Sequence, residues 1–457
     1  MHTFALLMLL ATAGSPAGDG PRVLWSVPTS SHCFGSGAIA DADGDGGLDV
    51  AFASYFGDAK VRVLCGKDGR ELWSYHDPDP NRDDCYDASV RFADLGDGKL
   101  SLVVPCSSGC RVLAFDAATG AVKWNTYLGD GECIDTPPSI GPVDGVGTMG
   151  VVVGTFKGTL HVLGPGGKVL RSIRVAPGAV QSCPIVTDLD GDGVPDFIAG
   201  NFRGDHAMHA IGGRDGSELW KVQTGSHIYH GVSVWNPRGD GTPHFVFGSY
   251  DGKVYSVDAK GAPDFVLAPG ERYFMSPTAI LDVDGDGKDE CIAACEKITA
   301  ISGEGKVLWQ HDLGSRGGWS SVTRGVSIAD LDGDGAKDLA YLTGDGMFRV
   351  LRAKDGAIVS EFNAGGVCGD GKPVSDSSHG PVIGDLNADG LLDVFLVVGG
   401  GGDKDADGTR KPRYGMAVCL TGFAGKGSAD NSWPMIRHDL RNSGNVRGPM
   451  DGGPGKK

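Results

Sequence analysis

Short runs of alternating apolar and polar residues recur along the chain, each bounded by glycine, aspartate or asparagine. Between residues 35 and 75 the runs are GSGAIA, DVAFASY, KVRVLCG and RELWSY. Alternation with period two over this length predicts half-buried β-strands. Few windows have helical periodicity, so the pattern predicts an all-β chain with little helix. Four short antiparallel strands of this kind make one blade of a β-propeller.

An acidic segment separates the first two strands of each repeat. In residues 188–196, DLDGDGVPD, carboxylates occupy positions one, three, five and nine, and glycines occupy positions four and six. Carboxylates this close repel one another unless a cation lies among them. Hard oxygen ligands in a flexible loop favour calcium over magnesium. Five copies carry the full set, and the predicted calcium ligands are Asp41, Asp43, Asp45, Asp49, Asp188, Asp190, Asp192, Asp196, Asp282, Asp284, Asp286, Glu290, Asp330, Asp332, Asp334, Asp338, Asp385, Asn387, Asp389 and Asp393.

Three degenerate copies fill the gaps between the five full ones. They begin at Asp94, Pro142 and Asn236 and lack most of the ligands. A repeat of about 46 to 55 residues is typical of propeller blades. The pattern predicts an eight-bladed β-propeller of four-stranded antiparallel blades, with the calcium loops between the first and second strands. Seven blades are the alternative if one degenerate copy is not a blade.

A second motif, a glycine followed four residues later by tryptophan, recurs in phase with the first. Its copies are Gly69–Trp73, Gly120–Trp124, Gly216–Trp220 and Gly305–Trp309. Each glycine fits a hairpin turn before a half-buried last strand. The final repeat lacks this motif, whereas RVLWSV at residues 22–27 has the strand without a blade. We therefore expect the N-terminal strand to complete the last blade and leave no open sheet edge. The rival closing segment lies around Trp433.

Composition and charge narrow the possible partners. The formal net charge of −17 argues against nucleic acid, because phosphate binding needs a basic face. Residues 4–13 form an apolar run that is too short to span a bilayer and fits a secretory signal. Eleven cysteines fit an exported protein with some disulfides. We predict a signal peptide at 1–17, a propeller at 22–446 and a disordered tail at 447–457, in a protein that is secreted, periplasmic or at the cell surface.

The acidic loops between apolar strands resemble the FG-GAP/VCBS repeats of integrin α-subunit propellers. The glycine–tryptophan strands resemble the PQQ-like repeat of bacterial quinoprotein propellers, and SWPMIRHDLRNSG resembles a closing segment of secreted bacterial proteins. The first resemblance implies calcium at positions one, three, five and nine of the full loops. It does not extend to the three degenerate copies. An EF-hand needs glutamate at position twelve and flanking helices, whereas that position here lies in strand-like runs.

The connections from the last strand of one blade to the first strand of the next converge on the face opposite the acidic loops. They are rich in functional side chains, and propellers commonly bind ligands where inner strands converge. The alternative is that these side chains pack between blades and satisfy local hydrogen bonds. The candidate ligand-binding residues are His32, Tyr86, Asp135, His227, His230, Tyr273 and His379.

No nucleophile elbow and no H-E-x-x-H motif occurs in the sequence. The sequence therefore favours a secreted calcium-binding propeller that binds a protein or a glycan, in adhesion or ligand capture, without catalysis. Calcium would be structural. The alternative is an extracellular enzyme on this scaffold, either a polysaccharide lyase, by resemblance to a rhamnogalacturonan lyase family with a calcium-binding propeller, or a quinoprotein dehydrogenase. Against the dehydrogenase, the chain is short for that class and lacks an adjacent cysteine pair.

Overall fold

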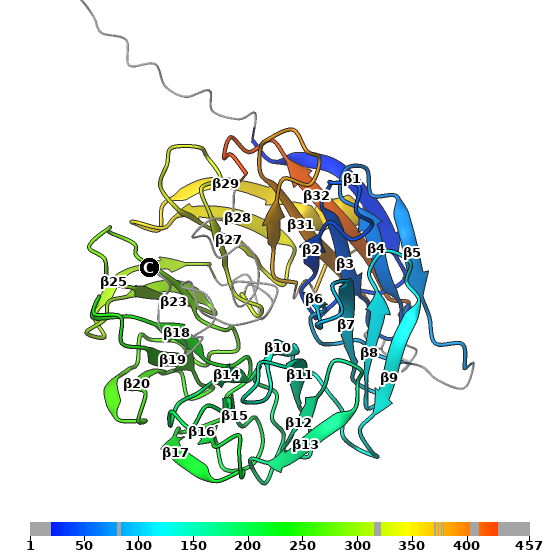
Figure 1. The fold of residues 1–457 in the computed structure, drawn as a ribbon. Helices are drawn as coiled ribbons and strands as arrows, with labels where there is room; N and C mark the ends of the chain where they lie inside the picture. The colour runs from blue at the N-terminus through cyan, green and yellow to red at the C-terminus, as the bar shows by residue number, and fades with distance from the viewer. Residues whose placement is uncertain are drawn as a thin grey trace, which may run out of the picture.

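The computed structural model describes residues 20–79, 84–314, 321–369, 372, 374–375, 377, 379–402 and 411–427. Within these residues the chain forms eight four-stranded antiparallel sheets arranged as a ring (Figure 1). The predicted eight-bladed all-β propeller is confirmed, and the seven-bladed alternative is wrong. The predicted signal peptide, the predicted tail and the segment around Trp433 lie outside the described residues.

Blades 1 to 4 follow one another along the chain. Blade 1 contains β2 (Ala38–Ala40), β3 (Asp49–Ala53), β4 (Val61–Cys65) and β5 (Glu71–Tyr75). Blade 2 contains β6 (Arg91–Asp94), β7 (Leu100–Cys106), β8 (Arg111–Asp116) and β9 (Val122–Tyr127). Blade 3 contains β10 (Ser139–Pro142), β11 (Met149–Gly154), β12 (Thr159–Leu163) and β13 (Val169–Arg174). Blade 4 contains β14 (Ile185–Thr187), β15 (Asp196–Gly200), β16 (Ala207–Ile211) and β17 (Glu218–Gln223).

Blades 5 to 7 continue in the same way. Blade 5 contains β18 (Ser233–Trp235), β19 (His244–Gly248), β20 (Val254–Asp258) and β21 (Pro263–Leu267). Blade 6 contains β22 (Ala279–Leu281), β23 (Glu290–Ala294), β24 (Lys297–Ile301) and β25 (Val307–Asp312). Blade 7 contains β26 (Ser327–Ala329), β27 (Asp338–Leu342), β28 (Met347–Arg352) and β29 (Ile358–Asn363). A short 3-10 helix, η1 (Ala364–Cys368), follows, and none of the helices in the described ranges is long and apolar enough to cross a bilayer.

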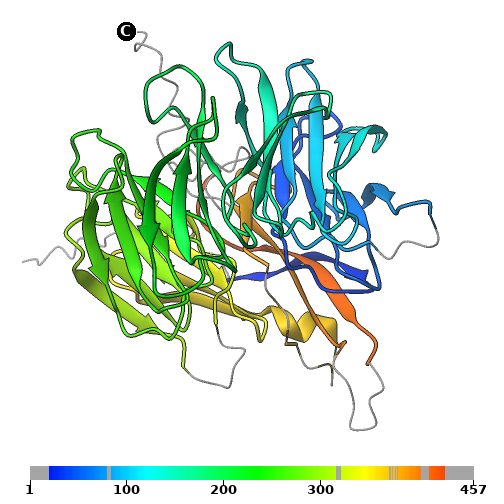
Figure 2. The ribbon, with the colours of Figure 1, turned by 90° about the horizontal axis from the view of Figure 1, so that it is seen from below.

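Blade 8 joins the two ends of the described chain. It contains β30 (Val382–Gly384), β31 (Asp393–Gly400), β32 (Tyr414–Thr421) and, outermost, β1 (Arg22–Thr29). Strand β1 pairs antiparallel with β32, with Trp25 opposite Cys419, and the two lie side by side in Figure 1. The predicted closure by the N-terminal strand is therefore what the structure contains. Seen from a direction turned by 90°, strands of the blades run between two faces where the turns gather (Figure 2).

The middle of each blade is buried, and the outer strand is half-exposed. Strands β3, β15, β19, β23 and β27 are buried at every residue, because neighbouring blades cover both faces. Outer strands such as β9 and β17 alternate between exposed and half-buried positions. This difference explains why apolar runs mark the second strands and alternation marks the last ones.

An outer-strand tryptophan joins each of five blades to the next blade. Its indole nitrogen donates to a backbone carbonyl near the neighbour's last hairpin, in the pairs Trp25–Gly66, Trp73–Ala117, Trp124–Pro165, Trp220–Ala259 and Trp309–Ala353, over 2.6 to 3.0 Å. The indole also covers the hairpin glycine. A Cβ atom on Gly69, Gly120, Gly167, Gly261 or Gly356 would lie 2.6 to 2.8 Å from a ring atom. The glycine–tryptophan motif is thus an interface between blades.

The expected disulfides do not occur. All eleven cysteines lie within the described residues and are free thiols. Most are buried, and burial raises the pKa of the Cys33 and Cys291 thiols well above the ordinary value. Cys110 and Cys133 come to 3.6 Å between their sulfur atoms without a bond. The cysteines are therefore mainly small core residues here.

We expect Gly120→Ala to destabilise the protein strongly. Gly120 has φ of +71° and lies beneath the Trp73 ring, so alanine suffers both backbone strain and a clash. We expect the free energy of unfolding, measured in urea, to fall by about 3 kcal/mol or more. Gly314→Ala is the matched control, because Gly314 also has φ of +71° but no atom of the described residues within 4 Å of an added Cβ. The control should lower the free energy of unfolding by about 1–2 kcal/mol. Equal losses of stability in the two variants would argue against the contact with Trp73 as the cause.

Candidate functional site

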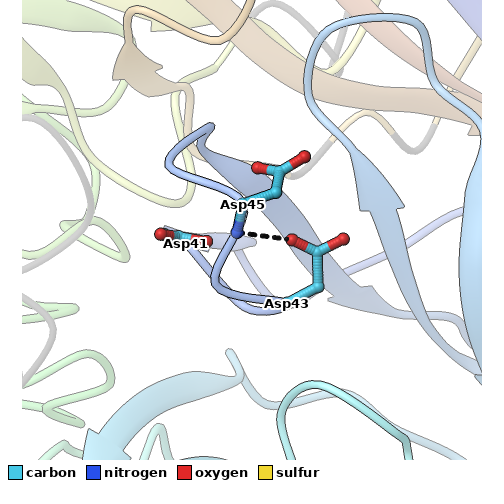
Figure 3. A group of neighbouring side chains, drawn as sticks. All are labelled: Asp41, Asp43 and Asp45. Carbon is cyan, nitrogen blue, oxygen red and sulfur yellow. Dashed lines mark hydrogen bonds between the residues drawn. The ribbon is translucent and has the colours of Figure 1, made fainter.

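The acidic loops lie between the first and second strands of their blades, as predicted. Four groups of three acidic side chains place ligand oxygens within 4.8 Å of one another, namely Asp41–Asp43–Asp45, Asp188–Asp190–Asp196, Asp282–Asp284–Glu290 and Asp330–Asp332–Asp338. Figure 3 shows the first group arranged around its turn. These four groups belong to blades 1, 4, 6 and 7. Acidic clusters that could hold a metal ion therefore recur at one position of the blade.

Backbone amides hold each loop in shape. In blade 1, Asp41 accepts from the amides of Gly44 and Gly46 at 2.8 and 3.1 Å, and Asp43 accepts from Asp45 at 3.1 Å. The two glycines have φ of +80° and +89°, a conformation that side chains disfavour. Asp188 and Asp330 accept from the corresponding glycines of their own loops. The carboxylates are therefore positioned by the local chain.

The acidic residue at position nine begins the second strand and is buried. Burial, with nearby carboxylates adding to it, raises the pKa of Asp49 to about 6 and the pKa of Asp338 and Glu290 to about 7. Each also accepts a backbone amide from position two of its loop, as Asp338 does from Leu331 at 2.9 Å. Holding these groups as anions is costly in the absence of a positive charge. A divalent cation would supply that charge, and the all-oxygen donor set fits calcium.

Some predicted ligands are turned away from the groups. Asp192 pairs with Arg214, and Asp286 pairs with Lys288 at 2.7 Å. In the fifth loop, the Asn387 amide nitrogen donates to Asp389 at 3.0 Å, so it occupies an oxygen that a metal would need. The Asp385 loop forms no acidic group of this kind in the part of the chain that is described. Sequence alone could not reveal these local competitors.

The connections between blades lie on the opposite face and are tied to the turns after the second strands. The amides of Tyr55, Phe202 and Tyr250 donate to the carbonyls of His32, Ala179 and His227 at 2.7 to 3.0 Å. The connection that holds His227 also reaches back to the previous blade, where Ile228 donates to Asn201 at 3.0 Å. Each such connection therefore bridges two blades and places its side chains on one face, which we call the channel face.

A pair of carboxyl groups lies on the channel face. Asp135 accepts from Ser107 at 2.6 Å and from Gln181 at 2.8 Å, and Asp87 accepts from the Cys85 thiol at 3.0 Å. Burial and the neighbouring Asp135 raise the pKa of Asp87. The charge of Asp135 therefore disfavours a second negative charge on Asp87. A perturbed carboxyl in such a setting marks a candidate functional site.

Arg324 in the connection to blade 7 was missed by the sequence prediction. Its guanidinium is 2.6 Å from the His230 ring nitrogen and 5.8 Å from the centre of the Tyr229 ring. Its charge also reaches Asp87, whose pKa it lowers against the larger effect of burial. Arg324 and Asp87 are separated by five blades along the chain, so only the closed ring brings them together.

The other predicted ligand residues divide between core and surface. Tyr86 packs between blades 1 and 2, and His379 accepts from the Gly37 amide at 2.8 Å, so both have structural roles. His32 is buried against Tyr55, and burial lowers its pKa to about 4. His227 and Tyr273 are half-buried beside other aromatic rings.

Several of these side chains keep polar atoms without a hydrogen-bond partner among the described residues. They are both ring nitrogens of His32, the hydroxyl of Tyr86, and the Nδ1 atoms of His227 and His379. Arg324 Nε also has no hydrogen-bond partner among the described residues. Buried polar groups are normally satisfied by protein, water or ligand. Half of the sixteen orphaned atoms in the described residues belong to the blade connections, where the sequence predicted a ligand site, and the other half lie in strands and acidic loops.

The fold defines a class of protein, the eight-bladed β-propellers. Neither models of known protein families nor curated protein sequences match the chain. Among solved structures, it is similar to the quinohemoprotein alcohol dehydrogenase ADHIIG from Pseudomonas putida HK5, with a TM-score of 0.59 and 14% identity over 90% of this chain and 78% of that one.

Two further solved structures are similar to this chain in fold. BamB from Moraxella catarrhalis has a TM-score of 0.54 at 17% identity, with 88% of this chain and 97% of that chain covered. The computationally designed Ika8 protein has a TM-score of 0.54 at 15% identity, with 87% and 99% covered. At these identities the likeness extends to the fold alone, so the site must be argued from its own residues.

We expect excess EDTA to lower the melting temperature of the calcium-loaded protein, as measured by differential scanning calorimetry. A bound ion stabilises the folded state by about 2.7 kcal/mol when its concentration is 100 times its dissociation constant. Asp338→Asn should remove one ion from the titrated stoichiometry, while the asparagine oxygen can still accept from Leu331. Asp240→Asn, in the degenerate copy at residue 236, should change neither quantity. An unchanged melting temperature in EDTA would contradict the assignment of metal ions to these loops.

Proposed function

We propose that this protein is a secreted, calcium-binding propeller of the FG-GAP/VCBS type that captures a protein or glycan ligand without catalysis. The observation that carries the proposal is the division between its two faces. Acidic groups that fit calcium lie at the turns of one face, and the connections of the other face carry polar side chains such as His32 and Arg324 with buried atoms that no described residue satisfies. The N-terminal apolar run supports export to the periplasm, the cell surface or the medium.

Calcium is structural in this proposal. The acidic loops join the two inner strands of a blade, so an ion there neutralises carboxylates that would otherwise repel one another. The loop of blade 7 also meets residues that follow β32, because Ala424 donates to Leu331 at 3.0 Å. Leu392, at the end of the blade 8 loop, donates to Gly425 at 2.8 Å. Ions in blades 7 and 8 would thus stabilise the region where the ring closes.

Ligand capture takes place on the channel face. The side chains there include carboxyls, imidazoles, a guanidinium, an amide and several rings, a mixture suited to orienting a polar ligand. Asp135 is the residue best placed to contribute, since its half-buried carboxylate already accepts two side-chain hydrogen bonds. The ligand is a protein or a glycan, and nucleic acid is disfavoured by the net charge of −17.

We expect the calcium-loaded protein to retain a ligand on a protein array or a glycan array, and to lose it in EDTA because the ring loosens. Asp135→Asn should weaken retention about tenfold, since a charged hydrogen-bond acceptor is worth roughly 1.5–3 kcal/mol. Asp240→Asn, on the opposite face, should retain the ligand as the native protein does. Absence of retention on both arrays, or release of unsaturated products from acidic polysaccharides, would contradict a non-catalytic module.

A further inference from the structure

Aromatic side chains occupy the same position in four blades of the channel face. Tyr55, Phe156, Phe202 and Tyr250 each lie two residues after the end of their blade's second strand. The amide of each donates to the carbonyl of a blade connection at 2.7 to 3.0 Å, so the four positions are held alike. We call these four residues the turn aromatics. Nothing in the strand pattern requires rings there, since the corresponding residue of blade 6 is Glu296.

The turn aromatics are only partly buried. Phe156 is 41% exposed, and the other three are half-buried. Leaving a large ring partly in water forfeits much of the stabilisation that its burial would provide, about 1.5–3 kcal/mol for a full phenylalanine side chain. A gathering of such rings on one face, with polar groups around it, is typical of a binding surface.

Two of the turn aromatics belong to a larger group that crosses blades 4, 5 and 6. We call it the Phe202 cluster, and its members are Phe202, His227, Tyr229, Tyr250 and Tyr273. Ring centres are 5.0 Å apart for Phe202 and Tyr229, 5.8 Å for Phe202 and Tyr250, and 5.3 Å for Tyr250 and Tyr273. The cluster is therefore continuous across three blades.

Guanidinium groups lie over these rings. Arg203 is 5.6 Å from the centre of Phe202, Arg324 is 5.8 Å from Tyr229, and Arg413 is 5.1 Å from Tyr55. The Asp87–Asp135 pair lies on the same face, where Asp135 accepts hydrogen bonds from Ser107 and Gln181. The channel face thus combines ring surfaces with planar polar groups that form paired hydrogen bonds.

We propose that the channel face binds a glycan, with sugar rings on the Phe202 cluster and hydroxyl groups toward Asp87, Asp135 and Arg324. This inference rests on the proposed ligand-binding function and names its ligand class. A sugar ring has an apolar face whose C–H groups meet the negative face of an aromatic ring. Its adjacent hydroxyls match carboxylate, amide and guanidinium groups, which the channel face supplies around the rings.

Other occupants fit these residues less well. The flat rings of the Phe202 cluster suit the apolar face of a sugar better than the branched apolar residues of a peptide. A peptide that adds a strand pairs with a sheet edge through its backbone, so it has no need of aromatic side chains at the turns. Stacked nucleobases also bind aromatic rings, but their phosphates would meet the Asp87–Asp135 pair and a net charge of −17.

Titration calorimetry on the calcium-loaded full chain tests the proposal with four probes. These are cellohexaose, xylohexaose and maltohexaose, which are neutral, and hexagalacturonate, which is acidic. We expect saturable binding of at least one, weakened at least tenfold by Phe202→Ala and by Tyr250→Ala. Phe202→Tyr keeps the ring and should stay within about twofold of the native protein. Tyr127→Ala is the control, because this 56% exposed ring lies on the outer strand β9.

The outcomes separate this inference from the proposed function. If none of the four probes binds, while a defined protein from the array is retained in a manner that Phe202→Ala abolishes, the face binds protein and the glycan inference is overturned. If glycan binds but neither alanine variant weakens it, the assignment to the Phe202 cluster is overturned. If nothing binds to the channel face, both proposals are refuted. Circular dichroism and melting of each variant show whether a lost affinity reflects a lost fold.

Discussion

The ring depends on the contact between an outer-strand tryptophan and the hairpin glycine of the next blade. A hydrogen bond from the indole fixes the ring to a backbone carbonyl, and the absence of a Cβ atom on the glycine lets the two blades approach. The glycine must also adopt a positive φ, so the turn and the interface require the same residue. Trp25 extends this contact to strand β1, which docks on blade 1 while completing blade 8. Closure of the ring is thus one more copy of the contact between blades.

Closure also explains why the two faces of the ring differ. Every second strand begins at an acidic loop and ends at a turn, so repeating the blade repeats both ends in a circle. Each acidic loop is formed within its own repeat, and its own backbone amides hold its carboxylates. The turns at the opposite face involve several repeats, because each connection bridges two blades and brings together side chains from distant repeats. An acidic group can therefore form within one loop, whereas the side chains of the channel face come together from several blades.

Features that repeat locally could be predicted from the sequence. Strand alternation, the spacing of the acidic loops and the unpaired strand at residues 22–27 together predicted eight blades and their closure, because each depends on neighbouring residues. The meeting of Asp87, Asp135 and Arg324 could not be predicted, since the ring's curvature brings them together. The hydrogen bond from the Asn387 amide to Asp389 could not be predicted either, because it depends on how the side chains are oriented in the folded loop. The disulfides expected from the cysteine count were wrong, because most of the thiols are buried as free core residues.

The most direct measurement is a crystal structure of the protein grown in calcium, with anomalous scattering used to locate the ions. The account predicts ions in the loops that begin at residues 41, 188, 282, 330 and 385, bound by positions one, three, five and nine. Asp192 and Asp286 should then leave Arg214 and Lys288 to join the ion. The copies at Asp94, Pro142 and Asn236 should remain without ions. Acidic loops that stay empty in saturating calcium, with an intact ring, would contradict the account.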